Sequence, residues 1–372
     1  MAQVESLPAP VWHSNSFELI SNSRYSVHRG FEGPLPRQVL ANVLWAASRV
    51  PRLGAYCELY AATPDNVYRY DPRKRTLVIQ RPGDHRCIPG SAFEVGIAAE
   101  SDIEMGYAVQ AGLLAGTAFW DSSRSGVVSC PMAFPARTAN DSWNPVHPIR
   151  MLNVYGRQAA NGLQHSLQAR SSDSSLPTPR VDGPDTFEAL ISGLQQDSIF
   201  KPSGLTRAAI SQILWAGYGV TPHTVAGGKQ GTTIPSAIAR YFLTGRVYLV
   251  NESGVQRYHN RLPPGTDLTT SDHRLEMVTP GDHRKSLRAA SPGLPVTAPV
   301  YIVICVADPK QGYAVQEAAY AGLQYLLQAE QLGLGGYLYA PGSSIERTAI
   351  DSALSLPASD QPVLVFSAGV RH

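Results

Sequence analysis

The sequence predicts an α+β fold that is built twice in one chain. The pentapeptide Pro82-Gly-Asp-His-Arg86 recurs as Pro280-Gly-Asp-His-Arg284, and Gly106-Tyr-Ala-Val-Gln110 recurs as Gly312-Tyr-Ala-Val-Gln316. Apolar stretches of helical period and of strand period both occur, without the strict β-α-β alternation of a parallel sheet. We therefore predict two copies of one α+β domain.

Two weaker matches support the duplication. Val43-Leu-Trp-Ala46 resembles Ile213-Leu-Trp-Ala216, and Arg69-Tyr70 recurs as Arg257-Tyr258. All four matches keep the same order along the chain, and their separation grows at every step, as longer loops in the second copy would cause.

A Ser- and Pro-rich stretch separates the copies and has the composition of an exposed linker. We expect copy 1 at residues 1–168, the linker at 169–185 and copy 2 at 186–372. A fused pair of this kind often replaces a two-fold dimer, so we expect an intrachain pseudo-dimer.

Periodicity predicts the elements in chain order. In copy 1 they are a helix through Val39–Ala47, strands at Phe93–Ala99 and Met151–Val154, and a helix at Gly106–Gln110. In copy 2 they are a helix through Ile210–Leu214, strands at Val247–Val250, Val300–Ala307 and Val363–Phe366, and a long Ala-rich helix from Gly312 that stops at Gly333 and Gly335. In each copy a short strand is expected to end in the Arg-Tyr pair.

Composition excludes several classes of function. Of 372 residues, 43% are hydrophobic, and 31 Lys and Arg against 29 Asp and Glu leave a net charge of +2. A charge so close to zero offers no field for nucleic acid or for an acidic membrane surface. The four cysteines are widely scattered, which excludes a disulfide scaffold and any local zinc motif.

We expect a cytoplasmic protein. The N-terminal residues lack the basic and apolar regions of a signal peptide. The longest apolar run, Val300–Ala307, is far shorter than the roughly 20 residues that cross a bilayer.

Common catalytic signatures are absent. The sequence has no G-x-S-x-G, no H-E-x-x-H, no G-x-G-x-x-G and no complete P-loop, since the Gly-Lys within Ala226–Thr233 has the wrong spacing. We therefore predict no metal site.

Two quieter segments could bind a ligand. Arg24 and Ser26 lie two residues apart, so on an extended segment both could bind one phosphate, with His28 or Arg29 adding charge. The alternative is a solvated basic segment.

In copy 2, Pro235 and Ser236 precede a strand. A turn fixed by proline can present a hydroxyl and backbone N–H groups to the carbonyls of a planar heterocycle. The alternative is an ordinary loop. Copy 1 has Pro51-Arg52 at the matching place.

Taken in order, these residues resemble the nitroreductase superfamily of flavoproteins, and within it the SagB-type, azoline dehydrogenase-like branch. The stretches that carry the resemblance are Arg24-Tyr-Ser26, Val43–Ala47, Tyr68-Arg-Tyr-Asp-Pro72, Pro235–Tyr241, Lys310-Gln-Gly312, Glu317-Ala318 and Leu332-Gly-Leu-Gly335. Together the two copies cover nearly the whole chain.

The resemblance implies an antiparallel sheet flanked by helices and an FMN cofactor. In the family's two-fold dimer one subunit holds the phosphate with its R-x-S arm, and the other brings its P-S loop against the flavin. It therefore implies that Arg24, Ser26 and Arg157 face the phosphate and that Pro235 and Ser236 face the flavin. Because the reciprocal set is incomplete, we expect one FMN per chain. Arg371 is the copy-2 counterpart of Arg157.

The resemblance also points to a candidate base. The family's Lys-Tyr-Gly element, implicated in catalysis, appears here as Lys310-Gln-Gly312, with Tyr313 close by but out of register. Lys310 or Tyr313 is the expected general base, provided that desolvation lowers its pKa. The alternative is a surface lysine before a helix.

The leading hypothesis is an FMN-dependent dehydrogenase that modifies a ribosomally made peptide such as a bacteriocin precursor, similar to trifolitoxin-processing proteins. Its partners would be the precursor peptide and other peptide-modification proteins. A second hypothesis is an NAD(P)H-dependent reductase of a small nitro or quinone molecule. A third is a flavin-free scaffold subunit of a modification complex.

Overall fold

The computed structural model describes residues 3–24, 26–27, 29–119, 126–158, 176–224, 229–261 and 271–372. The chain forms two compact units. Unit 1 comprises Met1–His165 and Pro184–Gly193, and unit 2 comprises Ser166–Gly183 and Leu194–His372. No helix among the described residues has the length and hydropathy needed to cross a bilayer.

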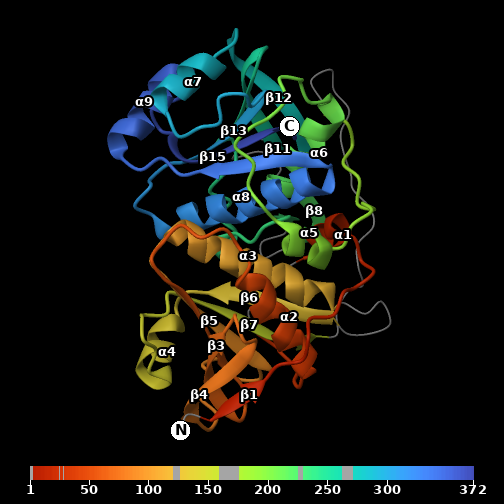
Figure 1. Ribbon diagram of the computed structural model, residues 1–372, viewed down its shortest axis with the longest axis vertical. Coiled ribbons are helices and arrows are strands. Elements are labelled where there is room, and N and C mark those ends of the chain that lie inside the picture. Colours follow the sequence, from red (N-terminus) through yellow and green to blue (C-terminus); the bar gives the residue numbers. More distant parts are fainter. Residues whose placement is uncertain are drawn as a thin grey trace. The chain divides into compact units, whose positions relative to one another are not determined.

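Unit 1 contains a seven-stranded antiparallel sheet in the order β1-β4-β3-β2-β5-β7-β6 (Figure 1). Its strands are β1 (Val4–Ser6), β2 (Cys57–Ala62), β3 (Asn66–Asp71), β4 (Thr76–Pro82), β5 (Phe93–Ala99), β6 (Gly126–Met132) and β7 (Met151–Gln158). Its helices are α1 (Phe17–Ser23), α2 (Arg37–Ala47), α3 (Asp102–Ala118), α4 (Ala136–Trp143) and α5 (Phe187–Gly193).

Unit 2 contains a six-stranded antiparallel sheet in the order β12-β11-β10-β13-β15-β14, and a separate pair of short strands. Its strands are β8 (Val220–Thr224), β9 (Gln230–Thr232), β10 (Val247–Asn251), β11 (Gly254–Arg261), β12 (Ser271–Pro280), β13 (Val300–Val306), β14 (Leu334–Tyr339) and β15 (Gln361–Val370). Its helices are α6 (Arg207–Tyr218), α7 (Arg284–Ala290), α8 (Gly312–Gln331) and α9 (Ser344–Leu354), with a 3₁₀ turn at Ala237–Ala239.

The two sheets share one topology. The order of β12, β11, β10, β13, β15 and β14 repeats the order of β4, β3, β2, β5, β7 and β6, and only β1 has no counterpart among the described strands. The predicted α+β class with two copies of one antiparallel domain is therefore confirmed.

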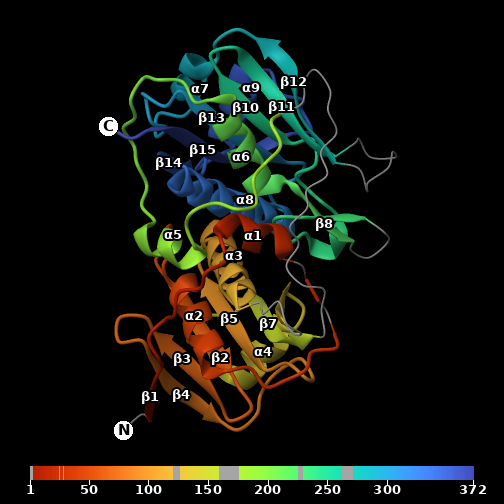
Figure 2. The ribbon, with the colours of Figure 1, turned by 90° about the vertical axis from the view of Figure 1, so that its right-hand side faces the viewer.

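Each sheet lies between two layers of helix. In unit 2, Figure 1 shows α7 and α9 on one face of the sheet and α8 on the other. Leu287, Ile350 and Leu354 from the first pair pack on Tyr248 and Val303 of the strands. In unit 1, α4 packs on the face of the sheet that α9 covers in unit 2. Helix α3, labelled in Figure 2, covers the opposite face. The long helices α3 of unit 1 and α8 of unit 2 are almost entirely buried and therefore form the centre of the core in their units.

Most predicted elements are confirmed, with two corrections. The Arg-Tyr pairs do not end the first strand after the helix. They lie on the next strand of a hairpin, where Arg69 pairs with Tyr60 and Arg257 with Tyr248. Gly335 does not stop α8 either, because the helix already ends before Gly333, which adopts a positive φ of 68°, and Gly335 belongs to β14.

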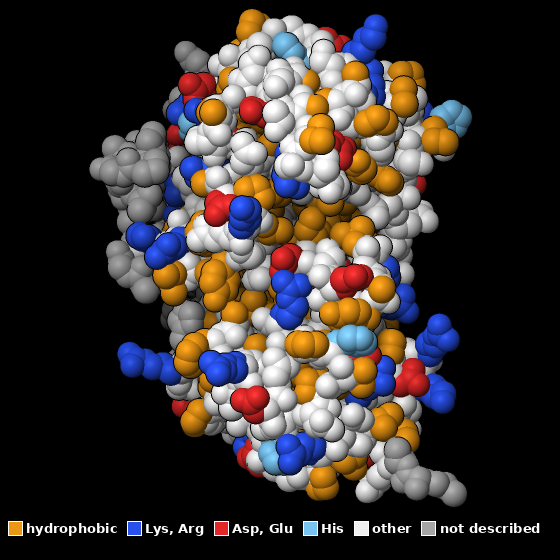
Figure 3. All heavy atoms as spheres, turned by 90° about the vertical axis from the view of Figure 1, so that its left-hand side faces the viewer, with side chains coloured by type: hydrophobic (Ala, Val, Ile, Leu, Met, Phe, Trp, Pro, Cys, Tyr) orange, Lys and Arg blue, Asp and Glu red, His pale blue; other side chains and the backbone are white. Residues whose placement is uncertain are grey.

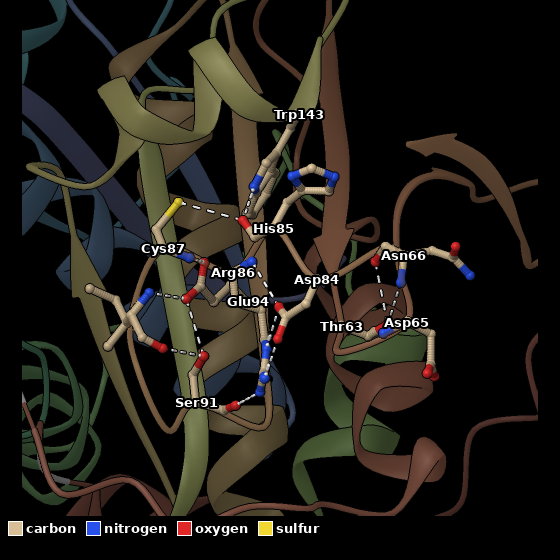
Figure 4. Close-up of polar contacts among 11 residues, drawn as sticks. Thr63, Asp65, Asn66, Asp84, His85, Arg86, Cys87, Ser91, Glu94 and Trp143 are labelled. Atoms are coloured by element: carbon tan, nitrogen blue, oxygen red, sulfur yellow. Dashed lines mark hydrogen bonds and ion pairs between the residues drawn. The ribbon is translucent and has the colours of Figure 1, made fainter. Parts of the chain in front are cut away.

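The repeated Pro-Gly-Asp-His-Arg segment forms a similar turn in both units, and Figure 4 shows the turn of unit 1. Asp84 accepts two bonds from the Arg86 guanidinium, at 2.9 and 2.7 Å, and Asp282 accepts the same two from Arg284, at 2.8 and 2.6 Å. In both turns the glycine has a positive φ, 94° for the first and 98° for the second. The remaining arm of each arginine donates to a carbonyl just before β5 or β13. The turn therefore ties the outer hairpin to the central strand.

A further repeat became visible only in the structure. Helices α1 and α5 begin with the same Phe-Glu pair, 170 residues apart, and both Glu18 and Glu188 are buried. Ser16 and Thr186 cap the two helices and pair with each other in an antiparallel bridge. By sequence α5 is the second copy's counterpart of α1, yet both helices belong to unit 1.

We expect Asp282→Asn to lower the free energy of unfolding by about 1 kcal/mol or less at pH 7, since the pair is partly exposed and screened. Hydrogen bonds from Arg284 hold the pKa of Asp282 at about 2, below its ordinary value of 3.8. The contribution is therefore present above pH 3.8 and is lost as the pH falls through about 2. Urea denaturation at pH 7, 4 and 3 checks this.

Asp182→Asn serves as the control, because Asp182 and Arg180 form a loose pair with exposed side chains. A difference between the Asp282 variant and the native chain that stays constant from pH 7 to pH 3 would contradict the assignment.

Candidate functional site

The R-x-S arm of unit 1 is anchored to the edge of its sheet. Ser26 forms a parallel bridge to Ser129 of β6, and Val27 donates to the Ser129 carbonyl at 3.3 Å. The Arg24 side chain is buried, and its Nη1 donates to Ser26 Oγ at 3.3 Å. The guanidinium and the hydroxyl are therefore neighbours, and their binding of a shared anion stays a prediction. Arg29 is exposed, and His28 lies outside the described residues.

Arg157 lies on the neighbouring strand. Ser129 pairs with Tyr155 of β7, and Arg157 follows two residues later, so Ser26, Tyr155 and Arg157 project from the same face of the sheet. Arg157 is exposed and forms no ion pair with a described residue. Its backbone exchanges two hydrogen bonds with Glu32, both at 2.7 Å, which hold the strand end in place.

The structure corrects the predicted counterpart in unit 2. The Val370 carbonyl accepts from the Lys201 N–H as the Arg157 carbonyl accepts from the Glu32 N–H, so Val370 stands at the position of Arg157, and Arg371 follows it. Arg371 Nε lies 3.1 Å from Asp197 Oδ2, and the same guanidinium forms an ion pair with Glu330. A guanidinium shared by two carboxylates attracts a further anion weakly, because its charge is already neutralised. Unit 2 therefore has no arginine at the position of Arg157, and the arginine beside that position is paired.

The P-S loop of unit 2 is held in a constrained conformation. Ser236 Oγ accepts from the Tyr241 backbone N–H at 2.6 Å, and Pro235 is buried. Ile238, Ala239 and Tyr241 have positive φ values of 48°, 52° and 55°. Such left-handed positions are costly for residues other than glycine and gather at functional sites.

A buried carboxyl group lies behind this loop. Glu317 Oε1 accepts from Tyr218 Oη at 3.0 Å and from the Leu243 N–H at 3.3 Å. Ser236 lies close enough to this carboxyl group to lower its pKa. Oε2 has no partner of ordinary hydrogen-bond geometry among the described residues.

The environment of Glu317 makes it titratable near neutrality. Burial raises the pKa of Glu317 to about 7, although hydrogen bonds from Ser236 and Tyr218, and then the charge of Arg261, lower it. The fold therefore favours the protonated acid. This contribution to stability is complete below pH 4.5 and is lost as the pH rises through about 7.

Arg261 adds a second buried charge to this region. Its guanidinium lies 4.0 Å from the centroid of the Tyr241 ring, and Nη2 reaches the Gly231 carbonyl at 3.5 Å. The residue is only 1% exposed, and its Nε and Nη1 have no hydrogen-bond partner within the described ranges. A buried guanidinium in this state favours a nearby negative charge or an ordered water.

Unit 1 has an equivalent carboxyl group in a different setting. Glu104 Oε2 accepts from the N–H groups of Leu53 and Gly54 at 3.1 and 2.8 Å, while Arg52 Nε lies 2.5 Å from Oε1. Leu53 stands four residues before β2, as Leu243 stands four residues before β10. Glu104 and Glu317 therefore both accept backbone N–H groups of the connection before the central strand. Of the two, only Glu104 forms an ion pair with a described residue.

A cavity of about 110 Å³ lies beside this connection in unit 1. Its polar lining includes Arg52, Cys57, Glu58 and Arg69. Burial and the nearby carboxylate of Glu104 raise the pKa of Cys57 to about 12, so this thiol stays protonated at neutral pH.

The other cysteines are equally unreactive. Burial raises the pKa of Cys87 and of Cys130 to about 12 and the pKa of Cys305 well above its ordinary value. Catalysis by a thiolate nucleophile is therefore excluded. No group of three or more His, Cys, Asp and Glu in the described parts of the chain could hold a metal ion.

Lys310 and Tyr313 lie at the start of α8. Both side chains are exposed, Tyr313 to 46%. Neither side chain is buried, so their predicted role as a general base stays a prediction. Tyr313 stands one turn before Glu317 on the same helix face.

Charges are interspersed on the face of the molecule shown in Figure 3. Blue and red side chains alternate there, and neither sign forms a continuous field. This agrees with the net charge of +2.

Sequence reasoning missed the role of Glu317. A signal was available, because Glu317 is the single charged residue in the stretch Gly312–Ala329, whose other residues are mostly apolar. It also missed Tyr218 and Arg261, because in the sequence Tyr218 looks like an ordinary helix residue and Arg261 like an ordinary strand residue.

No protein-family model matches the chain, and no curated protein matches it in sequence. Among solved structures, it is similar to a proposed nitroreductase from Anabaena variabilis, with 11% identity over 96% of this chain and 100% of that chain and a TM-score of 0.66. At this identity the similarity establishes the fold alone. The chain therefore has a nitroreductase-like α+β fold.

Two further similarities are partial. A proposed nitroreductase from Ralstonia eutropha matches 56% of this chain and 96% of its own, at 22% identity and a TM-score of 0.43. A chain of the Escherichia coli microcin synthetase complex, solved with truncated pro-MccB17 bound, matches 55% of this chain and 79% of its own, at 16% identity and a TM-score of 0.36. TM-scores this low support no conclusion.

We expect Arg52→Met to destabilise the protein by about 2 kcal/mol at pH 8, because it leaves the buried Glu104 carboxylate without its cation. Chemical denaturation at pH 8 checks the expectation.

Arg37→Met is the matched control. Arg37 forms a surface pair with Glu5 at 2.6 Å, and such pairs contribute about 1 kcal/mol or less. Equal losses for both variants would show that Glu104 does not depend on Arg52.

Proposed function

We propose that the chain is an FMN-dependent oxidoreductase of the nitroreductase type. The observation that carries the proposal is the contrast between the two arginines near the ends of β7 and β15. Arg157 is exposed and free of ion pairs with described residues, whereas Arg371 is held by Asp197 and Glu330. Only unit 1 therefore keeps an available guanidinium beside an R-x-S arm.

The residues of unit 1 fit a phosphate group. Arg24 and Ser26 already share a hydrogen bond, and Arg157 projects from the same face of the sheet as Ser26. Two guanidinium groups and a hydroxyl are the donors that a phosphate monoester prefers. In this proposal Arg24, Ser26 and Arg157 hold the phosphate of FMN, with His28 and Arg29 adding positive charge.

The residues of unit 2 fit the polar edge of a flavin. Pro235 fixes the loop, and Ser236 is partly exposed, so its hydroxyl can reach a ligand. A bound flavin would supply hydride acceptance and donation. The chain would supply orientation through Ser236, and Lys310 or Tyr313 would be available for proton transfer once a substrate covers them.

The order of motifs along the chain supports a ribosomally made peptide as the substrate, with other peptide-modification proteins as partners, as in SagB-type enzymes. Such a peptide is available in the cytoplasm. The exposed Lys310 and Tyr313 favour a bulky substrate that contributes its own desolvation. A small nitro or quinone substrate is the alternative.

We expect the purified protein to contain about one FMN per chain, measured by absorption after denaturation. Arg157→Ala should lose most of the flavin, because the phosphate loses a free guanidinium. Arg371→Ala should retain it, because Arg371 is already paired within unit 2.

Equal flavin loss in both variants would contradict the assignment of the phosphate to unit 1. A protein that takes up no FMN even in excess cofactor would overturn the oxidoreductase proposal and leave a flavin-free scaffold. Rapid bleaching of the bound flavin by NADH or NADPH would favour the small-molecule reductase over the peptide dehydrogenase.

A further inference from the structure

The cavity between the end of α2 and strands β2 and β3 is separate from the R-x-S arm. Its volume of about 110 Å³ is lined by residues of unit 1 alone. The arm is anchored to β6, and β5 and β7 lie between β6 and β2 in the sheet. The cavity is therefore a second place at which unit 1 can bind a ligand.

The cavity exists because a small residue follows α2. Ser48 lines it, and the Ser48 hydroxyl donates back to the Trp45 carbonyl at 2.8 Å. The repeated Leu-Trp-Ala segment just before it aligns Ser48 with Tyr218 of unit 2. The Tyr218 ring is buried and reaches from the end of α6 to Glu317, to which its hydroxyl donates at 3.0 Å. In unit 1 the serine leaves the corresponding space open.

Both carboxylates at the cavity are already bound by donors of the protein itself. Glu58 accepts from Arg69 at 2.6 Å and from the Tyr60 hydroxyl at 2.8 Å. Glu104, next to the cavity, accepts two backbone N–H groups and pairs with Arg52. A ligand therefore need not bring a cation.

The two guanidinium groups at the cavity keep unused donors. A guanidinium has five N–H donors. Arg69 donates from Nη2 to Glu58, and its Nε and Nη1 have no acceptor in the described part of the chain. Arg52 pairs through Nε with Glu104 and reaches the Cys57 carbonyl from Nη1 only at 3.5 Å, so no described residue binds its Nη2. Both side chains are about half exposed, so a ligand that brings acceptors can reach them.

The rest of the lining favours an apolar ligand body. It includes the apolar side chains of Ala47, Val50, Leu59, Tyr70 and Pro72. A planar carboxylate matches the fork of a guanidinium, and its single negative charge suits a lining with two guanidinium groups and one carboxylate. One water needs roughly 10 to 15 Å³ of such a volume, so the cavity has room for a ligand of roughly ten non-hydrogen atoms.

We infer that this cavity is a binding site for a small organic carboxylate with an apolar body, which Arg52 and Arg69 hold by its charged end. The site goes beyond the proposed flavin chemistry and does not depend on it.

The first test uses benzoate as the probe, because it joins one carboxylate to a flat apolar ring of suitable size. Isothermal titration calorimetry at pH 7 should give a Kd of about 1 mM or below. Benzamide has the same shape without the charge and should bind about tenfold more weakly or less. Benzoate that binds no better than benzamide would overturn the inference, and so would inorganic phosphate that binds more tightly than benzoate.

The second test locates the site. Arg69→Gln removes one guanidinium while Glu58 keeps its bond from Tyr60, and the affinity for benzoate should fall about tenfold. Arg257→Gln is the matched control, because Arg257 belongs to the repeated Arg-Tyr pair of unit 2 and should leave the affinity unchanged. Thermal melting of both variants without benzoate separates unfolding from loss of binding. Equal affinities in the two variants would overturn the inference.

A third variant leaves every charge in place. Ser48→Leu should fill part of the cavity and weaken benzoate binding, whereas the FMN content should stay at the native value because the R-x-S arm lies at β6. Native affinity for benzoate in this variant would overturn the inference. A protein that takes up no FMN but binds benzoate in this pattern would refute the flavin proposal alone.

Discussion

The architecture of each unit depends on one buried carboxyl group at the start of its longest helix. Glu104 on α3 and Glu317 on α8 reach across to the chain that leads into the central strand and accept its backbone N–H groups. Those N–H groups have no strand partner at this point, and leaving them unpaired in the interior costs more than a hydrogen bond contributes. Helix, connection and sheet are thereby fixed to one another.

The two copies diverged around this constraint without breaking it. The connection between helix and central strand runs from Ser48 to Tyr56 in unit 1 and from Gly219 to Arg246 in unit 2. The longer connection carries β8, β9 and the constrained loop at Ser236. Loop closure becomes only slightly costlier with length, so an insertion is tolerated where both of its ends are already held. New polar chemistry could therefore arise beside an unchanged fold.

Local physics explains which features the sequence could predict. Helices such as α2 and strands such as β13 follow from periodicity, whereas the antiparallel sheet was implied by the family resemblance. The match of Glu104 to Glu317 could not be predicted. The pentapeptides Gly106–Gln110 and Gly312–Gln316 lie 206 residues apart, whereas the two carboxyl groups lie 213 apart. An alignment on the identical pentapeptides therefore shifts the two helices by seven residues, or two turns, relative to the positions that make the same contacts in the two folds. The pairing of Arg371 depends on Asp197 and Glu330, which are remote in sequence.

Helix α5 shows that the genetic repeat and the physical unit are different objects. The chain leaves unit 1, contributes Ser166–Gly183 to unit 2, returns with Pro184–Gly193 and then leaves again. A chain divided within this crossover gives one fragment that lacks α5 and another whose α5 has lost its packing partners in unit 1. We therefore expect that the two halves do not fold as independent modules when they are separated at the repeat boundary.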